Sequence, residues 1–202
     1  MNYLAHLYLS GDIPGVLLGN FIGDYVKGSR YNRYEHDIKT GILLHRKIDS
    51  FTDSHPLTKK SSLIFREYYR KYAGIVVDIV YDHFLAANWD KYKKESLNSF
   101  VSSSHKLLIN NYFLLPGTVK KFLPFLIKSR RMENYKYPES IQQTLKIMSR
   151  HSSMPNFSDE AYRLTMGNYE LLREDFFTFF NEMEKECQQF LTMIYQDHRQ
   201  AI

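Results

Sequence analysis

Two pairs of side chains able to bind a metal or transfer a proton stand four positions apart in the chain. His45 and Asp49 lie within residues 41–56, and Asp78 and Asp82 lie within the apolar residues 74–89. Residues four apart share one face of an α-helix. Each stretch is therefore expected to present two ligating groups on one side while its apolar residues face a core. All-helical proteins build metal sites from such pairs.

Pairs with this spacing also occur on ordinary helix surfaces. The surrounding sequence must therefore decide between a metal site and a solvent-exposed pair. An unpaired carboxylate in an apolar helix costs several kcal/mol, and the like charges of Asp78 and Asp82 repel unless a cation lies near them. Asp24 and His83 extend the set. Carboxylates with a neutral imidazole suit Mn²⁺, Mg²⁺, Fe²⁺ or Zn²⁺. The sequence therefore predicts a divalent metal site.

Other polar residues lie close to these positions along the chain. Arg46 could clamp a phosphate oxygen or pair with Asp49 or Asp53. Asn20 lies one turn before Asp24 and is expected to orient it.

Two further histidines have two interpretations each. His6 is flanked by apolar residues, where a histidine is either a satisfied core residue or a functional one. His55 precedes Pro56 and is either a turn residue or a substrate contact.

Composition indicates one all-α domain covering residues 1–202. Of the 202 residues, 44% are apolar, with 14 Phe and 16 Tyr, so the core should be rich in rings. Only nine Gly and six Pro are present, which argues against a loop-rich β-sandwich. The one cysteine, Cys187, excludes a disulfide framework. We see no signal peptide and no membrane span, so a cytoplasmic location is the expectation.

Hydrophobic periodicity and helix start and stop signals divide the chain into helices. We expect them over about residues 2–9, 12–28, 36–51, 57–72, 74–92, 95–112, 117–132, 138–148 and 158–194.

The formal net charge is +5, which favours an anionic partner or serves only solubility. Residues 31–34 interleave tyrosine with a base, a weak nucleic-acid signal. No nucleic-acid-binding motif supports it, so no nucleic-acid partner is expected.

Four segments resemble the acyl carrier protein phosphodiesterase family, also called acyl carrier protein hydrolase. They are residues 1–7 (MNYLAHL), 19–28 (GNFIGDYVKG), 41–56 (GILLHRKIDSFTDSHP) and 81–89 (YDHFLAANW). The resemblance runs nearly end to end. It implies an all-helical fold of the HD-phosphohydrolase type, a divalent metal, usually Mn²⁺, and removal of 4′-phosphopantetheine from holo-acyl carrier protein. HD proteins have an adjacent His-Asp pair, whereas Asp82-His83 is reversed here.

On this resemblance, we expect Asp24, His45, Asp49 and Asp82 to hold Mn²⁺, with Mg²⁺ or Fe²⁺ as alternatives and Asp78 in support. His83 is expected to protonate the leaving serine oxygen or to act as a ligand. Arg46 or Lys27 would offset the phosphate charge. The acidic carrier would dock on the basic doublets Lys120-Lys121 and Arg130-Arg131.

Two other functions stay open at this point. The same metal site could serve a phosphohydrolase acting on a nucleotide or another small phosphodiester. A non-enzymatic helical module that binds a carrier or RNA would hold no metal at these residues.

Overall fold

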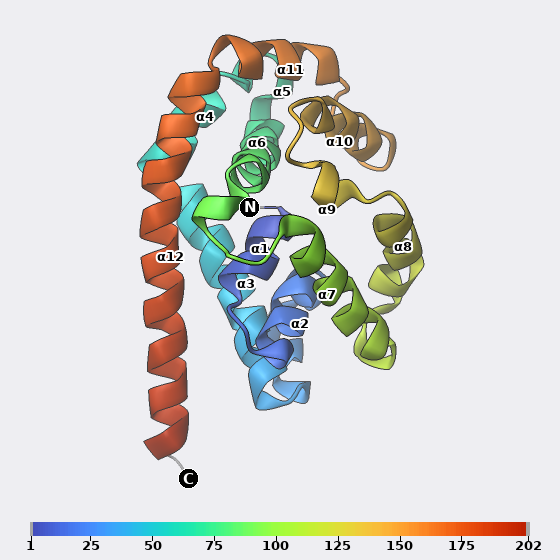
Figure 1. The fold of residues 1–202 in the computed structure, drawn as a ribbon, viewed down its shortest axis with the longest axis vertical. Helices are drawn as coiled ribbons and strands as arrows, with labels where there is room; N and C mark the ends of the chain where they lie inside the picture. Colours follow the sequence, from blue (N-terminus) through green and yellow to red (C-terminus); the bar gives the residue numbers. More distant parts are fainter. Residues whose placement is uncertain (1, 201–202) are drawn as a thin grey trace.

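Helices account for nearly all of residues 2–200, the part of the chain that this computed structural model describes (Figure 1). No strand occurs in that range, so the predicted all-α class is confirmed. Residues 1 and 201–202 of the predicted domain lie outside the described residues. The α-helices are α1 (Tyr3–Leu9), α2 (Pro14–Ile22), α3 (His36–Ser54), α4 (Pro56–Leu63), α5 (Arg66–Tyr69), α6 (Ala73–Ala87), α7 (Leu97–Asn110), α8 (Gly117–Lys128), α9 (Arg131–Asn134), α10 (Glu139–Arg150), α11 (Ser158–Gly167) and α12 (Tyr169–Gln200). Short 3₁₀-helices lie between them: η1 (Gly23–Tyr25), η2 (Gly28–Arg33), η3 (Arg70–Tyr72), η4 (Trp89–Lys91) and η5 (Tyr112–Leu114).

Several of the predicted helices are divided in the structure, and two of these divisions have a clear local cause. Residues 57–72 form α4, α5 and η3, because the chain turns at Phe65 and buries that ring completely. Residues 158–194 are interrupted at Asn168, which follows the poor helix former Gly167 and binds a carbonyl oxygen of the preceding turn through its side-chain amide. The interruption lets α11 pack against α10 while α12 packs against α3 and α4.

The contact between α2 and α3 brings the two helix backbones together, which only glycine permits. A Cβ atom on Gly19 of α2 would lie 2.0 Å from a backbone carbonyl oxygen of α3. A Cβ atom on Gly41 of α3 would lie 2.1 Å from a carbonyl oxygen of α2. Both distances are far below van der Waals contact, so an alanine at either position would have to push the helices apart.

A buried helix, α6, connects the N-terminal helices with the C-terminal half. It contacts α1, α4, α10 and α12. Its rings pack against those of α12, with centroid separations of 5.4 Å for Tyr81–Phe176 and 5.8 Å for Phe84–Phe176. The long α12 runs along one side of the molecule, at the left of Figure 1. The core is rich in rings, as the composition predicts. Within residues 2–200, no helix has the length and apolar character needed to cross a membrane.

The glycine contact gives a test of how tightly the site-bearing helices must pack. Gly41→Ala should lower the free energy of unfolding by roughly 2 kcal/mol, because the clash with α2 exceeds the gain in helix propensity. The matched control is Gly74→Ala on α6, where an added Cβ would meet nothing within 4 Å. That control should leave stability unchanged or raise it by up to about 1 kcal/mol. Equal effects of the two variants in urea unfolding would contradict the role given to the α2–α3 contact.

Candidate metal centre and active site

A pocket of about 420 Å³ opens between α1, α2, α3, α6, α9 and α10. It combines acids, histidines, one arginine and apolar side chains. The polar side chains that line it include Asp24, Asp49, Asp53, Asp78, His6, His45, Asn20 and Arg131. This gathering of titratable groups in a concave site makes it the candidate active site.

Helix α3 carries the pair with the spacing of four, and the structure brings both members into the pocket. His45 Nε2 lies 3.2 Å from Asp49 Oδ2. It also lies 3.4 Å from Oδ1 of Asp24. Asp24 belongs to η1, because α2 ends at Ile22 rather than at the predicted stop near Gly28. Two predicted ligands, Asp24 and Asp49, therefore place carboxylate oxygens beside the Nε2 atom of a third, His45.

His6 on α1 joins this group, although its sequence context left its role open. Its Nε2 lies 3.3 Å from Asp49 Oδ1. Its ring stacks on that of His45 with a centroid separation of 4.1 Å. Asp49 is thus placed between two imidazoles, with one carboxylate oxygen facing each. Within residues 2–200, the ligand atoms of His6, His45 and Asp49 form the one group of three or more that lie close enough together to share a metal ion, all within 4.8 Å of one another.

Asn20 fixes the orientation of both histidine rings. Its backbone oxygen accepts the Nδ1–H of His45 at 2.8 Å. Its side-chain oxygen lies 2.8 Å from Nδ1 of His6, and its amide nitrogen donates to the His6 carbonyl and to Ser10 Oγ. Since that amide is fully used as a donor, its oxygen must accept from Nδ1–H of His6. In its neutral form, each imidazole therefore directs an Nε2 lone pair at the carboxylates. Asn20 was expected to orient Asp24, whereas in the structure its hydrogen bonds orient the two histidines.

These residues fit a divalent cation. His45 Nε2 is buried and has no hydrogen bond of acceptable geometry, although two carboxylates lie within 3.4 Å. A lone pair facing carboxylate oxygens is stable only with a cation or a proton between them. Histidine ligands in metal sites characteristically donate their other N–H to a carbonyl or similar acceptor, as His6 and His45 do here. Two imidazoles with carboxylates suit Mn²⁺, Fe²⁺ or Zn²⁺.

The charges of the cluster shift the pKa values of its members. Burial alone would lower the pKa of His45, but Asp24 and Asp49 outweigh it and raise that pKa to about 9. Contact with His45 lowers the pKa of Asp24. Burial would raise the pKa of Asp49, yet the two histidines lower it. Burial lowers the pKa of His6 to about 4. Both carboxylates stay ionised, and their negative potential draws a cation to the histidine nitrogens.

Asp53 and Asp78 line the same pocket beside this cluster. Asp53 is exposed near the end of α3, and Asp78 is half-buried on α6. Burial raises the pKa of Asp78, and the negative charges of Asp49 and Asp53 add to this effect. The second helical pair therefore contributes only Asp78 to the pocket.

Asp82 does not line the pocket, so the structure does not bring this predicted ligand to the cluster. Its carboxylate is fully buried and accepts the backbone N–H groups of Leu4 at 2.9 Å and Ala5 at 3.2 Å. Those N–H groups belong to the first turn of α1, where backbone donors have no partner within the helix. Asp82 therefore holds α1, and with it His6, against α6.

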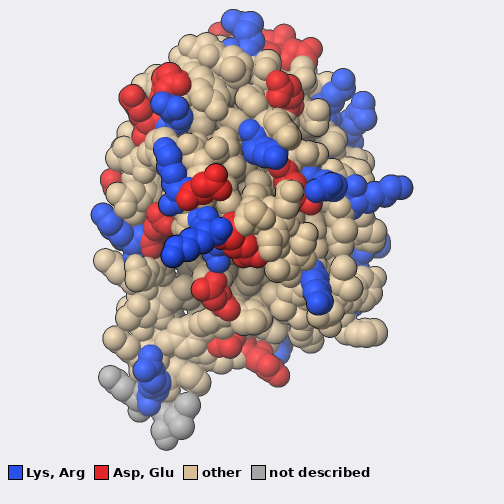
Figure 2. All heavy atoms as spheres, in the orientation of Figure 1, with Lys and Arg blue, Asp and Glu red and all other residues tan. Residues whose placement is uncertain are grey.

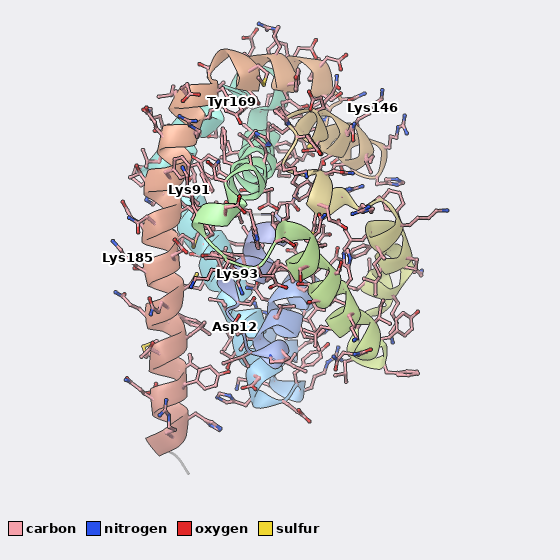
Figure 3. The ribbon with its side chains drawn as sticks, in the orientation of Figure 1. Asp12, Lys91, Lys93, Lys146, Tyr169 and Lys185 are labelled. Carbon is pink, nitrogen blue, oxygen red and sulfur yellow. The ribbon has the colours of Figure 1, made fainter. Side chains whose placement is uncertain are left out.

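The structure also places His83, predicted as proton donor or ligand, outside the cluster. Its Nδ1 donates to the Tyr135 carbonyl at 2.8 Å, and its Nε2 lies 2.9 Å from the hydroxyl of Tyr169. Tyr169 begins α12, at the top of the molecule in Figure 3. Both ring nitrogens are thus used to join α6 to later segments, and His83 does not line the pocket.

The residues predicted to offset phosphate charge lie elsewhere. The Arg46 guanidinium donates to the carbonyl oxygens of Val26 at 2.9 Å and Gly28 at 2.6 Å, and lies over the Tyr31 ring. It fastens the segment after η1 to α3 and does not line the pocket, so the structure does not bring the predicted phosphate clamp to the cluster. Lys27 is exposed and does not line the pocket.

His55 is a turn residue, the first of its two interpretations. Its Nδ1 accepts the Leu57 N–H at 3.2 Å at the start of α4, and its Nε2 lies 3.2 Å from Glu182 on α12. It does not line the pocket.

Arg131 was predicted to belong to the carrier-docking surface, but in the structure it lines the pocket. It follows Arg130, whose positive φ of 48° separates α9 from α8. The Nη2 atom of Arg131 is buried without a hydrogen-bond partner, and the guanidinium lies 5.2 Å from the Phe125 ring. A doublet of arginines gives no sequence signal that one member turns inward. The other predicted docking residues do not line the pocket, and Lys121 and Arg130 are exposed.

Comparison with known proteins gives one consistent family. The family described as acyl carrier protein phosphodiesterase matches residues 1–183. A protein of Yersinia enterocolitica with that name is 31% identical over 93% of this chain and 98% of its own length. The protein of that name from Photorhabdus laumondii is 35% identical over 74% of this chain and 76% of its own. One from Salmonella agona is 31% identical over 91% and 95%.

No solved structure matches the chain, so the expected likeness to HD phosphohydrolases stays a prediction. The family and its relatives cover almost all of the sequence, including every segment that forms the pocket. The chain therefore belongs to the acyl carrier protein phosphodiesterase family.

Proposed function

We propose that the protein is a metal-dependent phosphodiesterase. Its substrate is holo-acyl carrier protein, and the bond cleaved joins a serine oxygen of the carrier to the phosphate of 4′-phosphopantetheine. The products are apo-carrier and 4′-phosphopantetheine. Family membership supports the substrate, and the convergence of two histidine Nε2 atoms on Asp49 supports the chemistry. A cytoplasmic location follows from this substrate as a further prediction.

His6, His45 and Asp49 would hold the metal, with Asp24 as a further ligand. Mn²⁺ is the ion we favour and Fe²⁺ the alternative, because two imidazoles disfavour Mg²⁺. A divalent ion held there would polarise a phosphoryl oxygen and lower the pKa of water. Asn20 holds the Nδ1 atoms of both histidines, which leaves both Nε2 atoms facing the position of the ion, and Asp82 keeps α1 in place.

Arg131 would bind the phosphate, in the role first given to Arg46 and Lys27. Its side chain is half-buried and its Nη2 is buried without a hydrogen-bond partner, and such a donor is costly unless an acceptor enters. The phosphodiester would lie between this positive group and the acid–histidine cluster. A preorganised donor of this kind stabilises charge that builds up in the transition state.

Metal binding is tested by isothermal titration calorimetry with Mn²⁺ on chelator-treated protein. His6→Ala and Asp49→Ala should each weaken binding by at least about 100-fold, because each removes a ligand rather than an outer partner. The exposed His151→Ala is the matched control and should bind as the native protein does. Asp82→Asn should keep its affinity within about tenfold, since it acts only through α1. If Asp82→Asn loses binding while His6→Ala retains it, the proposed ligand set is wrong.

Hydrolysis is tested by mass spectrometry of holo-carrier incubated with protein and Mn²⁺. Apo-carrier and free 4′-phosphopantetheine should form, and Asp24→Ala or His45→Ala should abolish the reaction while the circular dichroism spectrum stays helical. Near-normal turnover by either variant would refute the site. A panel of nucleotides and small phosphodiesters runs in parallel. Cleavage of these compounds with holo-carrier left intact would favour the alternative phosphohydrolase function.

The phosphate-binding role of Arg131 predicts a loss of catalysis without a loss of metal. Arg131→Gln should lower kcat/KM by about 10²–10³-fold, as the removal of one transition-state donor does elsewhere. Its Mn²⁺ affinity should be unchanged, and Arg131→Lys should recover part of the activity. Arg150→Gln, which removes an exposed arginine of α10, is the control. Native kcat/KM in Arg131→Gln would exclude this role.

A further inference from the structure

Residues 96–132 contain no acidic residue, although the chain has 22 elsewhere. The same segment carries six cationic residues: Lys106, Lys120, Lys121, Lys128, Arg130 and Arg131. It forms α7, η5, α8 and the start of α9. Lys and Arg side chains lie along the right-hand edge of Figure 2, the side on which Figure 1 places α8. The segment is therefore positive, and of its cationic residues Arg130 lies 3.5 Å from an acid, Glu133.

Large apolar side chains are exposed on the same segment. Phe113 on η5 is 91% exposed, Ile109 is 53% exposed and Phe125 is 52% exposed. Leu114, next to Phe113 in η5, is 48% exposed. Apolar groups gathered on a surface and surrounded by charge mark interaction sites. We call this surface the basic-aromatic face and define it by Ile109, Phe113, Leu114, Lys121, Phe125 and Lys128.

Lys120 stabilises the conformation of η5 within the basic-aromatic face. Its Nζ donates to the carbonyl oxygen of Phe113 at 3.2 Å and lies 5.3 Å from the centroid of the Tyr112 ring. These contacts hold η5 against α8 and leave the Phe113 ring in solvent. Lys121 and Lys128 are exposed, so their charges remain available to a partner.

Helix α8 joins the face to the pocket. Its Phe122 ring contacts those of Tyr3 at 6.0 Å and Phe21 at 6.3 Å, and both of these residues line the pocket. Phe125 of the face lies under the guanidinium of Arg131, which also lines the pocket. Helix α8 thus packs against residues that line the pocket and also carries residues of the basic-aromatic face.

We propose that the basic-aromatic face docks the acidic protein body of the substrate, with Phe113 as the apolar anchor and Lys121 and Lys128 facing carboxylates. This inference rests on the proposed function, since the carrier body must stay outside a pocket that takes only its phosphodiester. Continuity with the pocket favours this occupant over a membrane or a second copy of the chain. It revises the predicted docking set: Arg131 belongs to the pocket, and Lys120 supports η5.

The test compares Lys121→Glu/Lys128→Glu and Phe113→Ser with Lys185→Glu, an exposed lysine on α12 at the opposite side of Figure 3. Steady-state rates are measured with holo-carrier and with bis(p-nitrophenyl) phosphate, a small diester that needs no docking. At low salt, the double variant should raise KM for holo-carrier by at least about tenfold with kcat within about twofold. The increase should shrink at high salt, because screening weakens the native attraction. Phe113→Ser should raise KM at both salt concentrations.

Cleavage of the small diester should be unchanged in all variants. An unchanged KM for holo-carrier in the double variant and in Phe113→Ser would overturn the docking proposal while leaving the proposed function in place. If the native protein does not turn over holo-carrier, apo-carrier binding is measured directly by calorimetry, and the absence of binding overturns the proposal.

Two further measurements separate the other occupants of the face. Light scattering reports whether Phe113→Ser turns a dimer into a monomer, and co-sedimentation reports binding to phosphatidylglycerol vesicles. Loss of either association in Phe113→Ser, with an unchanged KM for holo-carrier, would assign the face to self-association or to a membrane and refute the proposal.

Discussion

The candidate centre depends on Asn20, which holds two histidines in one tautomeric state. Its backbone oxygen takes the Nδ1 proton of His45, and its side-chain oxygen takes that of His6. In its neutral form, each ring directs a lone pair on Nε2 at Asp49. A single residue can serve both rings only because α2 and α3 approach through Gly19 and Gly41. The ligand geometry therefore depends on the two hydrogen bonds of Asn20, and these depend on the close contact between α2 and α3.

The electrostatics of the pocket follow from this arrangement. Acids dominate one part of it, and the low pKa of Asp49 keeps negative charge beside the imidazoles. Arg131 adds a half-buried positive group to the same pocket. A phosphodiester needs both features, since a cation polarises it and a guanidinium offsets its charge. Structural residues hold the parts in place: Asp82 fixes α1, His83 fixes α6, and Arg46 fixes the segment after η1.

The sequence predicts the features that depend on local periodicity. The all-α class follows from composition and helical patterns, and the pairing of His45 with Asp49 follows from their spacing of four. The same rule failed for Asp82, because its partners are backbone N–H groups 77 and 78 residues away. His6 and Arg131 could not be assigned from sequence, since a lone histidine and an arginine doublet do not indicate which direction a side chain takes. The division of the last helix at Asn168 also depends on the packing of α11 against α10.

The most direct test of the account is a crystal structure of the protein grown with Mn²⁺, with anomalous diffraction data to locate the ion. The account predicts one anomalous peak within about 2.0–2.4 Å of the Nε2 atoms of His6 and His45 and an oxygen of Asp49. In the same map, Nδ1 of each histidine should remain hydrogen-bonded to Asn20. A peak held by Asp82 or His83 instead, or no peak beside the two histidines at saturating Mn²⁺, would contradict it.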